Sequence, residues 1–203
     1  MISKKQKITH QELKLPKGGG AIKGLGESFS PNLFNGTSGL SIPIPVSPAR
    51  GLEPELSVNY NSAQGNGIFG LGFGLSIGQV SRKTNKTIPT YTDQDTFLLN
   101  GAKLIPKLKK VGTKWLPQAP RQIKENQQTY AVTSYWEEVE DRFAKNERWI
   151  NLKTQEEHWR IVDGNGTIEI YGSRPETRIS DPKDSLKVYA WLIESVQDKN
   201  GNK

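Results

Sequence analysis

Apolar and polar residues alternate with a period of two along two early segments of the chain. Residues 40–47 read LSIPIPVS and residues 55–60 read ELSVNY. Successive side chains of a strand point to opposite faces, so this period predicts half-buried β-strands over both segments. Pro43 and Pro45 are two residues apart, so the N–H groups that they lack would have pointed to the same neighbouring strand. We therefore expect the strand over 40–47 to lie at the edge of its sheet.

The same signals continue towards the C-terminus. Further strands are predicted over 77–81, 96–99, 103–106, 129–135, 148–152, 158–162 and 167–171. Asn100-Gly101 is typical of a two-residue hairpin turn, and residues 163–166 (DGNG) predict a second hairpin. Residues 188–196 (VYAWLIESV) begin as a continuous apolar run, which fits either a strand buried on both faces or a short helix.

Many short strands separated by turn signals, with almost no helical period, predict an all-β fold of short antiparallel strands and hairpins. Residues 1–27 form a different segment. The first 24 residues hold six lysines against one glutamate and end in a glycine-rich stretch, which predicts a flexible basic leader before a β-domain over 28–203. Residues 198–202 (DKNGN) form a turn sequence after an apolar strand, so we expect an N-terminal fragment of a longer polypeptide, interrupted within a hairpin.

Composition excludes several kinds of site. The 203 residues contain no cysteine and two histidines, which excludes disulfide frameworks, thiol catalysis and cysteine-ligated zinc or iron–sulfur centres. No apolar run is long enough to span a membrane, and the basic start lacks the apolar region of a Sec signal peptide. The net charge of +7 comes largely from the leader and from residues 103–124, which hold seven cations and no acid. These cations are mostly lysines, so a solvated surface is favoured over nucleic-acid or anionic-membrane binding.

Residues 65–70 (GNGIFG) match the spacing of a dinucleotide-binding loop. Such a loop needs its third glycine to open a helix, but Gly72 and Gly74 continue the glycine alternation and disfavour a helix. Asp93 comes slightly late for the acid that binds the ribose. We instead expect a crossing where backbones approach closely, with apolar side chains at 68, 69, 71, 73 and 75 packed around it.

Two other short motifs lack the residues that complete their chemistry. Residues 18–24 are glycine-rich like a phosphate loop, but Lys23-Gly24 reverses the required order. Glu138-Val139-Glu140 matches the two-glutamate pattern of arginine-specific ADP-ribosyltransferases. The Ser-Thr-Ser strand that holds the nicotinamide ribose in those enzymes is absent from this sequence.

Asp93, Asp95 and Thr96 supply oxygens that could bind calcium, but no downstream residue completes the loop, so we expect Asx turns. His158, beside Trp159 in a predicted strand, is interpreted as a half-buried structural residue. The sequence therefore predicts no catalytic, cofactor-binding or metal-binding residue, and no cofactor.

Taken together, the short motifs between about 25 and 202 resemble the N-terminal domain of the SpvB family. This family comprises the Salmonella plasmid virulence protein B and the B subunits of insecticidal toxin complexes (Tc toxins). The segments that carry the resemblance are residues 25–31 (LGESFSP), 39–46 (GLSIPIPV), 56–62 (LSVNYNS), 65–67 (GNG), 69–73 (FGLGF), 88–91 (IPTY), 95–98 (DTFL), 158–160 (HWR), 171–172 (YG), 178–179 (RI), 181–182 (DP) and 190–192 (AWL). Residues 198–202 resemble the turn of an RHS/YD-type repeat. The lysine-rich residues 103–128 depart from the family pattern.

The resemblance implies a scaffold without catalytic activity of its own. In toxin complexes, the B subunit and its C partner form a hollow shell of spiralling β-strips that encloses a C-terminal effector and docks onto a pore-forming A subunit. This chain would supply strips of such a curved β-shell. In the alternative, it is the carrier domain of an SpvB-type actin ADP-ribosyltransferase whose catalytic domain lies beyond residue 203. The resemblance also implies a secreted protein, cytoplasmic before release and released from bacteria without a Sec signal, that neither binds nucleic acid nor inserts into membranes.

Overall fold

The computed structural model describes residues 28–32, 34, 36–48, 52–67, 69–84, 88–139 and 143–203. Within these residues the regular structure consists of eighteen strands and one short 3-10 turn, η1 (Pro175–Thr177). The predicted all-β class is confirmed. The segment 188–196, which the sequence left open between strand and helix, lies within the longest strand, β18 (Asp184–Gln197).

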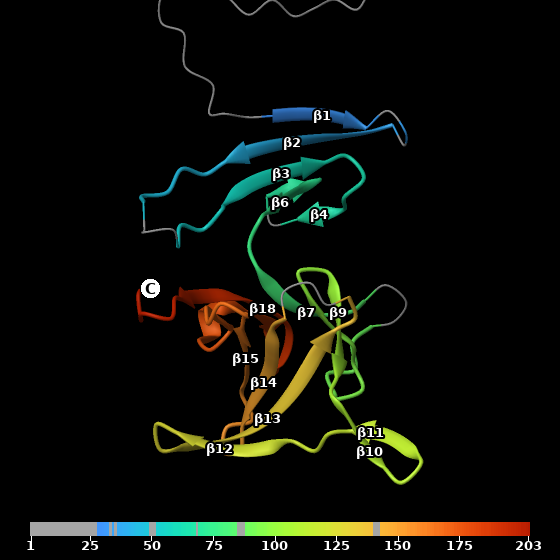
Figure 1. Ribbon diagram of the computed structural model, residues 1–203. Helices are drawn as coiled ribbons and strands as arrows, with labels where there is room; N and C mark the ends of the chain where they lie inside the picture. The colour runs from blue at the N-terminus through green and yellow to red at the C-terminus, as the bar shows by residue number, and fades with distance from the viewer. Residues whose placement is uncertain are drawn as a thin grey trace, which may run out of the picture.

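The first part of the chain forms a four-stranded antiparallel sheet in the order β1-β2-β3-β6. Its strands are β1 (Ser28–Asn32), β2 (Thr37–Pro43), β3 (Ser57–Asn61) and β6 (Phe73–Leu75). A two-stranded hairpin, β4 (Asn66–Gly67) and β5 (Gly70–Leu71), lies between β3 and β6 in the sequence. Figure 1 shows this sheet at the top, joined to the rest of the molecule through the segment that enters β7.

The predicted edge position of the strand containing Pro43 is wrong. β2 is an inner strand, paired with β1 on one side and with β3 on the other. The N–H of Ile44 donates to Leu56 at 2.8 Å, so the prolines at the alternate positions face the β1 side. Pairing with β1 extends only to Ser41, and Pro43 ends the strand. The missing N–H groups thus fall just beyond the ladder, where none is needed.

The second part is a closed eight-stranded barrel. The strand order β13-β14-β15-β16-β18-β7-β8-β9 returns to β13, because β9 also pairs with that strand. The barrel strands are β7 (Gln79–Arg82), β8 (Phe97–Leu99), β9 (Ala102–Pro106), β13 (Gln128–Glu137), β14 (Lys145–Asn151), β15 (Glu157–Val162), β16 (Ile168–Tyr171) and β18. Closure leaves no open edge around this ring.

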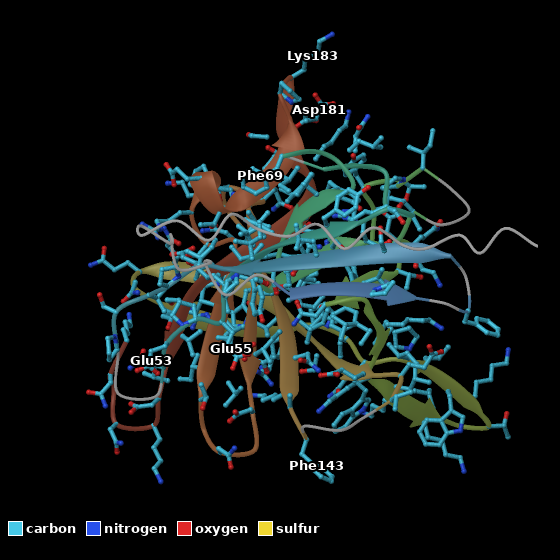
Figure 2. The ribbon with its side chains drawn as sticks, turned by 90° about the horizontal axis from the view of Figure 1, so that it is seen from above. Glu53, Glu55, Phe69, Phe143, Asp181 and Lys183 are labelled. Carbon is cyan, nitrogen blue, oxygen red and sulfur yellow. The ribbon has the colours of Figure 1, made fainter. Side chains whose placement is uncertain are left out.

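Two long strands allow the ring to close and to carry extra strands. β13 pairs through residues 128–132 with β12 (Arg121–Glu125) and through residues 135–137 with β9. β18 pairs with β17 (Arg178–Asp181) and β16 along one edge and with β7 along the other. Figure 2, seen from above, shows the β17–β18 turn with Asp181 and Lys183 projecting from the molecule.

The interior of the barrel is packed with side chains. The buried apolar core consists of Val80, Phe97, Leu99, Leu104, Tyr135, Ala144, Trp159, Ile161, Tyr171, Val188 and Trp191. Phe97 lies at its centre, with ring centroids 5.0 Å from Trp159 and 5.9 Å from Trp191, both in tilted or edge-on geometry. An eight-stranded barrel is just wide enough to be filled in this way, so the centre is a core and not a channel.

Tight turns connect the barrel strands as the sequence predicts. Asn100 and Gly101 both have positive φ, 49° and 91°, as a type I′ hairpin turn between β8 and β9 requires. The turns at 163–167 and 198–202 share one design. In each, the first aspartate accepts hydrogen bonds from the N–H groups two and four residues later, at 2.8 and 2.9 Å.

One hairpin stands apart from both bodies. β10 (Leu108–Val111) and β11 (Lys114–Pro117) pair only with each other, and Figure 1 shows them extending from the lower end of the barrel. The sequence predicted no strand between 107 and 128, so β10, β11 and β12 were missed. Their lysine-rich segments lack the apolar alternation that marks a half-buried strand.

Candidate functional site

The barrel interior holds an ion-pair network among its aromatic side chains. Arg82 and Arg148 are 1% and 3% exposed, and both lie next to Glu157. Arg148 donates to both Glu157 oxygens, from Nε at 3.1 Å and Nη2 at 2.5 Å, and Nη2 of Arg82 lies 3.6 Å from the same carboxylate. Glu157 therefore links two buried cations, and its fork-like pairing with Arg148 fixes the orientation of both groups.

A loop between β7 and β8 contributes the remaining carboxylates. Asp95 accepts from Nη1 of Arg82 at 2.8 Å and also from the N–H groups of Thr90 and Tyr91 at 2.9 and 2.8 Å. Burial raises the pKa of Asp95, but these hydrogen bonds together outweigh it and leave the pKa below its ordinary value. Asp93, on the exposed side of the loop, accepts from Nη1 of Arg148 at 2.7 Å. The loop is thus tied to both buried arginines.

Both guanidinium groups lie near the ring of Phe97. The Arg82 and Arg148 guanidinium carbons lie 5.0 and 4.9 Å from the centroid of its ring. Burial disfavours the charge of Arg148, but its pKa is raised overall because Glu157 and Asp93 stabilise the cation. Burial raises the pKa of Tyr135, which keeps the phenol neutral. Every charged group of the network therefore has an opposite charge beside it, and the arrangement locks the barrel interior and its covering loop together.

A second cluster covers the outer face of β13, β14 and β15. Trp149 and His158 stack at 5.8 Å between ring centroids, and the Arg160 guanidinium lies 3.9 Å from the Trp149 ring. Arg160 donates from Nε to His158 at 3.1 Å and pairs with Glu125 of β12. Burial first, and then the charges of Arg160 and Arg178, lower the pKa of His158 to about 4. His158 is a neutral, buried, structural histidine, and it is less exposed than the half-buried position that the sequence predicted.

The glycine-rich segment 65–70 forms the β4–β5 hairpin and not a strand-to-helix turn. The predicted close crossing is present, because a Cβ at Gly67 would lie 1.8 Å from the Phe73 carbonyl oxygen. The expected packing around it is wrong in part. Phe69, in the turn of this hairpin, is 53% exposed, and Leu71 of β5 is 69% exposed. Residue 68 lies outside the described residues.

The other motifs have structural surroundings. Glu138 pairs with Lys103 at 2.9 Å on the surface, while Glu140 and the glycine-rich segment 18–24 lie outside the described residues. Asp95 is hydrogen-bonded within its own loop and to Arg82, as the turn interpretation expects. Within the described ranges no group of three or more His, Cys, Asp or Glu side chains gathers to hold a metal ion. None of the helices in those ranges has the length and apolar character needed to cross a membrane.

Sequence reasoning missed the buried arginine network. The signal available in the sequence was the alternation of side chains between the two faces of a strand. Arg82 shares its strand face with Val80, and Arg148 pairs directly with Trp159, so both arginines point into the barrel. This alternation alone does not tell an inward arginine from an outward one, because the sequence does not show which face is enclosed.

Residues 32–203 match the family model described as SpvB, Salmonella virulence plasmid 65kDa B protein. The chain belongs to the SpvB family. Among its relatives are the Mono(ADP-ribosyl)transferases SpvB of Salmonella typhimurium and Salmonella dublin, each 29% identical over 187 residues. Those matches cover 89% of this chain and 30% of each relative, so the chain spans about a third of their length.

Solved structures with the same fold include chains of Tc toxins and the N-terminal domain of an SpvB effector. A chain of the TcdB2-TccC3 crystal structure is 34% identical with a TM-score of 0.72, covering 94% of this chain and 9% of that one. The Photorhabdus luminescens Tc holotoxin pore gives 33% identity and a TM-score of 0.72, covering 96% and 9%. The N-terminal domain of effector protein SpvB from Salmonella typhimurium strain LT2 is 29% identical with a TM-score of 0.67. That match covers 78% of this chain and 50% of the SpvB chain. The predicted resemblance is confirmed, and the chain corresponds to the N-terminal part of an SpvB- or Tc-type toxin.

Proposed function

We propose that this chain is a non-catalytic, structural part of a Tc-type toxin B subunit. It helps to form the hollow β-shell that encloses and delivers a C-terminal effector. The observation that carries this proposal is the similarity to the TcdB2-TccC3 chain, at 34% identity over 94% of the present chain. The similarity to the isolated SpvB domain covers 78%. The Tc-type match therefore includes more of the sheet-plus-barrel arrangement.

The construction of the barrel supports a structural role. Its interior is filled by aromatic and aliphatic side chains. Its buried charged groups form ion pairs, which join Arg82 to Asp95 and both Arg82 and Arg148 to Glu157. A wall element that encloses a cargo needs a fixed shape, and a closed barrel with a packed, cross-linked core resists deformation. In the described part of the chain these buried charged groups are engaged with one another, as a structural role requires.

The partners follow from the same proposal. The C subunit would complete the shell and carry the effector, and downstream regions of the B subunit would contact the pore-forming A subunit. Residues 28–203 would act as one β-unit behind a basic leader over 1–27, with an RHS/YD-like turn over 198–202. The toxin would act outside the bacterium that makes it. The proposal includes neither nucleic-acid binding nor membrane insertion by this chain.

A second candidate function rests on the curated relatives, which are named as mono(ADP-ribosyl)transferases. In this alternative the chain is the N-terminal carrier of an SpvB-type enzyme whose catalytic domain lies beyond Lys203. Reading the gene past the codon for Lys203 separates the two. RHS-type repeats and a propeller support the shell, whereas a Ser-Thr-Ser strand followed by Glu-x-Glu supports the carrier.

A direct test uses the complete B-type reading frame expressed with its C-type partner. We expect hollow particles in electron micrographs and an effector that resists added protease. Arg148→Met, which breaks the buried network, should expose the effector, while Lys183→Glu on the projecting turn should leave it protected. An effector that is digested equally in all three particles would reject the enclosing role.

A further inference from the structure

The β10–β11 hairpin forms a projecting arm, here called the basic arm and defined as residues 107–118. At its base the N–H of Gln118 donates to the Lys107 carbonyl at 2.7 Å, and the N–H of Lys107 donates to Ser134 of the barrel at 2.9 Å. At its tip Gly112, with φ of 62°, opens the two-residue turn between Val111 and Lys114. The arm is thus anchored at one end. Among the described residues, its two strands pair with each other and with no other strand.

Large apolar side chains lie exposed on both faces of the basic arm. Pairing of Leu108 with Pro117 and of Lys110 with Trp115 puts these four on one face. Val111 and Leu116 lie on the opposite face. Trp115 is 63% exposed and Val111 54%, and every strand residue of the arm is exposed. An isolated two-stranded ribbon is marginally stable in water, so these side chains gain most when a partner covers them.

Cations accompany the apolar side chains. Lys109, Lys110 and Lys114 lie on the arm, and no acid occurs between 103 and 124. A cavity of about 230 Å³ at the base is lined by Lys107, Gln118, Ala119, Arg121, Val132, Ser134 and Lys145. Glu147 pairs with both Arg121 and Lys145, so one carboxylate offsets only one of the three cations around this cavity. The arm and its base therefore share an uncompensated positive charge.

We propose that the basic arm docks onto an acidic surface of a separate polypeptide, with Trp115 seated in an apolar socket and the lysines facing carboxylates. The positive charge selects an acidic partner. Aliphatic side chains on both faces favour a protein, because a phosphate backbone offers them no apolar contact. A membrane surface would favour an arrangement with one apolar face and one cationic face, which the arm lacks. The arm points away from both bodies of its own chain, which favours a separate polypeptide (Figure 1). This proposal does not depend on whether the chain forms part of a hollow shell.

Photocrosslinking tests the docking in the complete protein. The substitution Trp115→benzoylphenylalanine is introduced into the full reading frame, which is expressed together with its neighbouring genes, irradiated, and analysed by mass spectrometry. We expect crosslinks that concentrate on one surface of a second polypeptide, within a segment rich in Asp and Glu. Phe69→benzoylphenylalanine, at a side chain that is 53% exposed in the turn of the β4–β5 hairpin, provides the control for accidental contacts.

Charge variants of the same photoreactive protein test the lysines. Replacing Lys109, Lys110 and Lys114 by Glu together should lower the crosslink yield about tenfold, because reversed charges repel an acidic face. Replacing Lys153, Lys183 and Lys199 by Glu makes the same change in net charge away from the arm, and should leave the yield unchanged. Because the arm side chains are exposed, both variants should melt within about 2 °C of the parent protein.

Four outcomes would overturn the proposal. They are a crosslink yield at position 115 no higher than at position 69, crosslinks to neutral or basic surfaces, crosslinks confined to the chain itself, and equal losses in the two lysine triples. Binding of the complete protein to a mixed-sequence DNA duplex or to phosphatidylserine vesicles is measured alongside at physiological salt. The parent protein could bind the DNA or the vesicles, and the variant with Lys109, Lys110 and Lys114 replaced by Glu could lose that binding while the control variant keeps it. This result would show that the arm recognises phosphates and not carboxylates.

Discussion

Glu157→Gln is the sharpest test of the buried network, because it removes a charge without changing the size of the side chain. Glu157 accepts two hydrogen bonds from Arg148, at 3.1 and 2.5 Å, and lies 3.6 Å from Arg82. Both arginines remain enclosed after the substitution, with side chains 4% and 1% exposed. The variant therefore contains two buried guanidinium groups that have lost the carboxylate between them.

The size of the effect follows from the geometry. At an effective dielectric constant of about 20, one unit charge pair at about 3 Å contributes about 5 kcal/mol. Dehydration of the ions, which costs several kcal/mol each, offsets much of this gain. Asp95 still neutralises Arg82, and Asp93 compensates Arg148 weakly because its side chain is 85% exposed. We expect Glu157→Gln to lower the free energy of unfolding by about 3 kcal/mol, the lower end of the range for breaking a buried pair.

Urea unfolding followed by tryptophan fluorescence measures this change, since Trp159 and Trp191 are fully buried in the barrel. The thermal midpoint should fall by about 6–12 °C. Arg148→Met should cost a similar amount, and the double variant Arg148→Met/Glu157→Gln should be more stable than either single variant because no unpaired buried charge remains. A loss below about 1 kcal/mol for Glu157→Gln, or additive losses in the double variant, would refute the reasoning.

Three further predictions follow from single residues. Gly172→Ala should destabilise the barrel by at least about 2 kcal/mol in urea unfolding, because φ is 65° and the new Cβ would lie 2.4 Å from an indole ring of β18. The pKa of His158 is lowered to about 4, so its stabilising contribution is complete above about pH 6.5 and is lost as the pH falls towards 4. His158→Gln should therefore remove about 2 kcal/mol of the stability difference between pH 7 and pH 5. Asp95→Ala should release the amides that it binds in the β7–β8 loop, which hydrogen exchange detects as lost protection.

Each of these predictions has a matched control. Gly166 has a φ of 87° but room for a Cβ, so Gly166→Ala should cost about 1 kcal/mol, and equal losses at 166 and 172 would contradict the steric argument. An unchanged pH profile in His158→Gln would mean that other groups set the acid sensitivity. Asp93→Ala removes the exposed carboxylate of the same loop, and equal exchange in Asp93→Ala and Asp95→Ala would refute the anchoring role of Asp95.

Three barrel strands with an enclosed face were predicted correctly by their sequences. The predicted strands over 129–135 and 158–162 lie within observed strands, and the one over 148–152 overlaps β14 up to Asn151. The Asn100-Gly101 turn has the expected positive φ values. The strands of the basic arm were not predicted, because a ribbon that is exposed on both faces needs no alternation of apolar and polar residues.

The edge assignment of the Pro43 strand failed for another reason. A proline without its N–H disturbs a ladder only where a neighbour is present at that position. In β2 the neighbouring strand pairs only as far as Ser41, so the strand can be internal despite its prolines. The sequence shows the missing donor but not the length of the strand beside it.

The sequence by itself determined the all-β class, most of the barrel strands, their hairpin turns, the exclusion of cysteine chemistry and the family resemblance, because each depends on residues close together in the chain. Only the tertiary structure decided that these strands close into a ring. Closure depends on β18 pairing with β7 and β9 pairing with β13, contacts between segments distant in sequence. It also decided that Arg82 and Arg148 face an enclosed interior, since a period of two gives a strand two faces but does not say which one the other strands will cover.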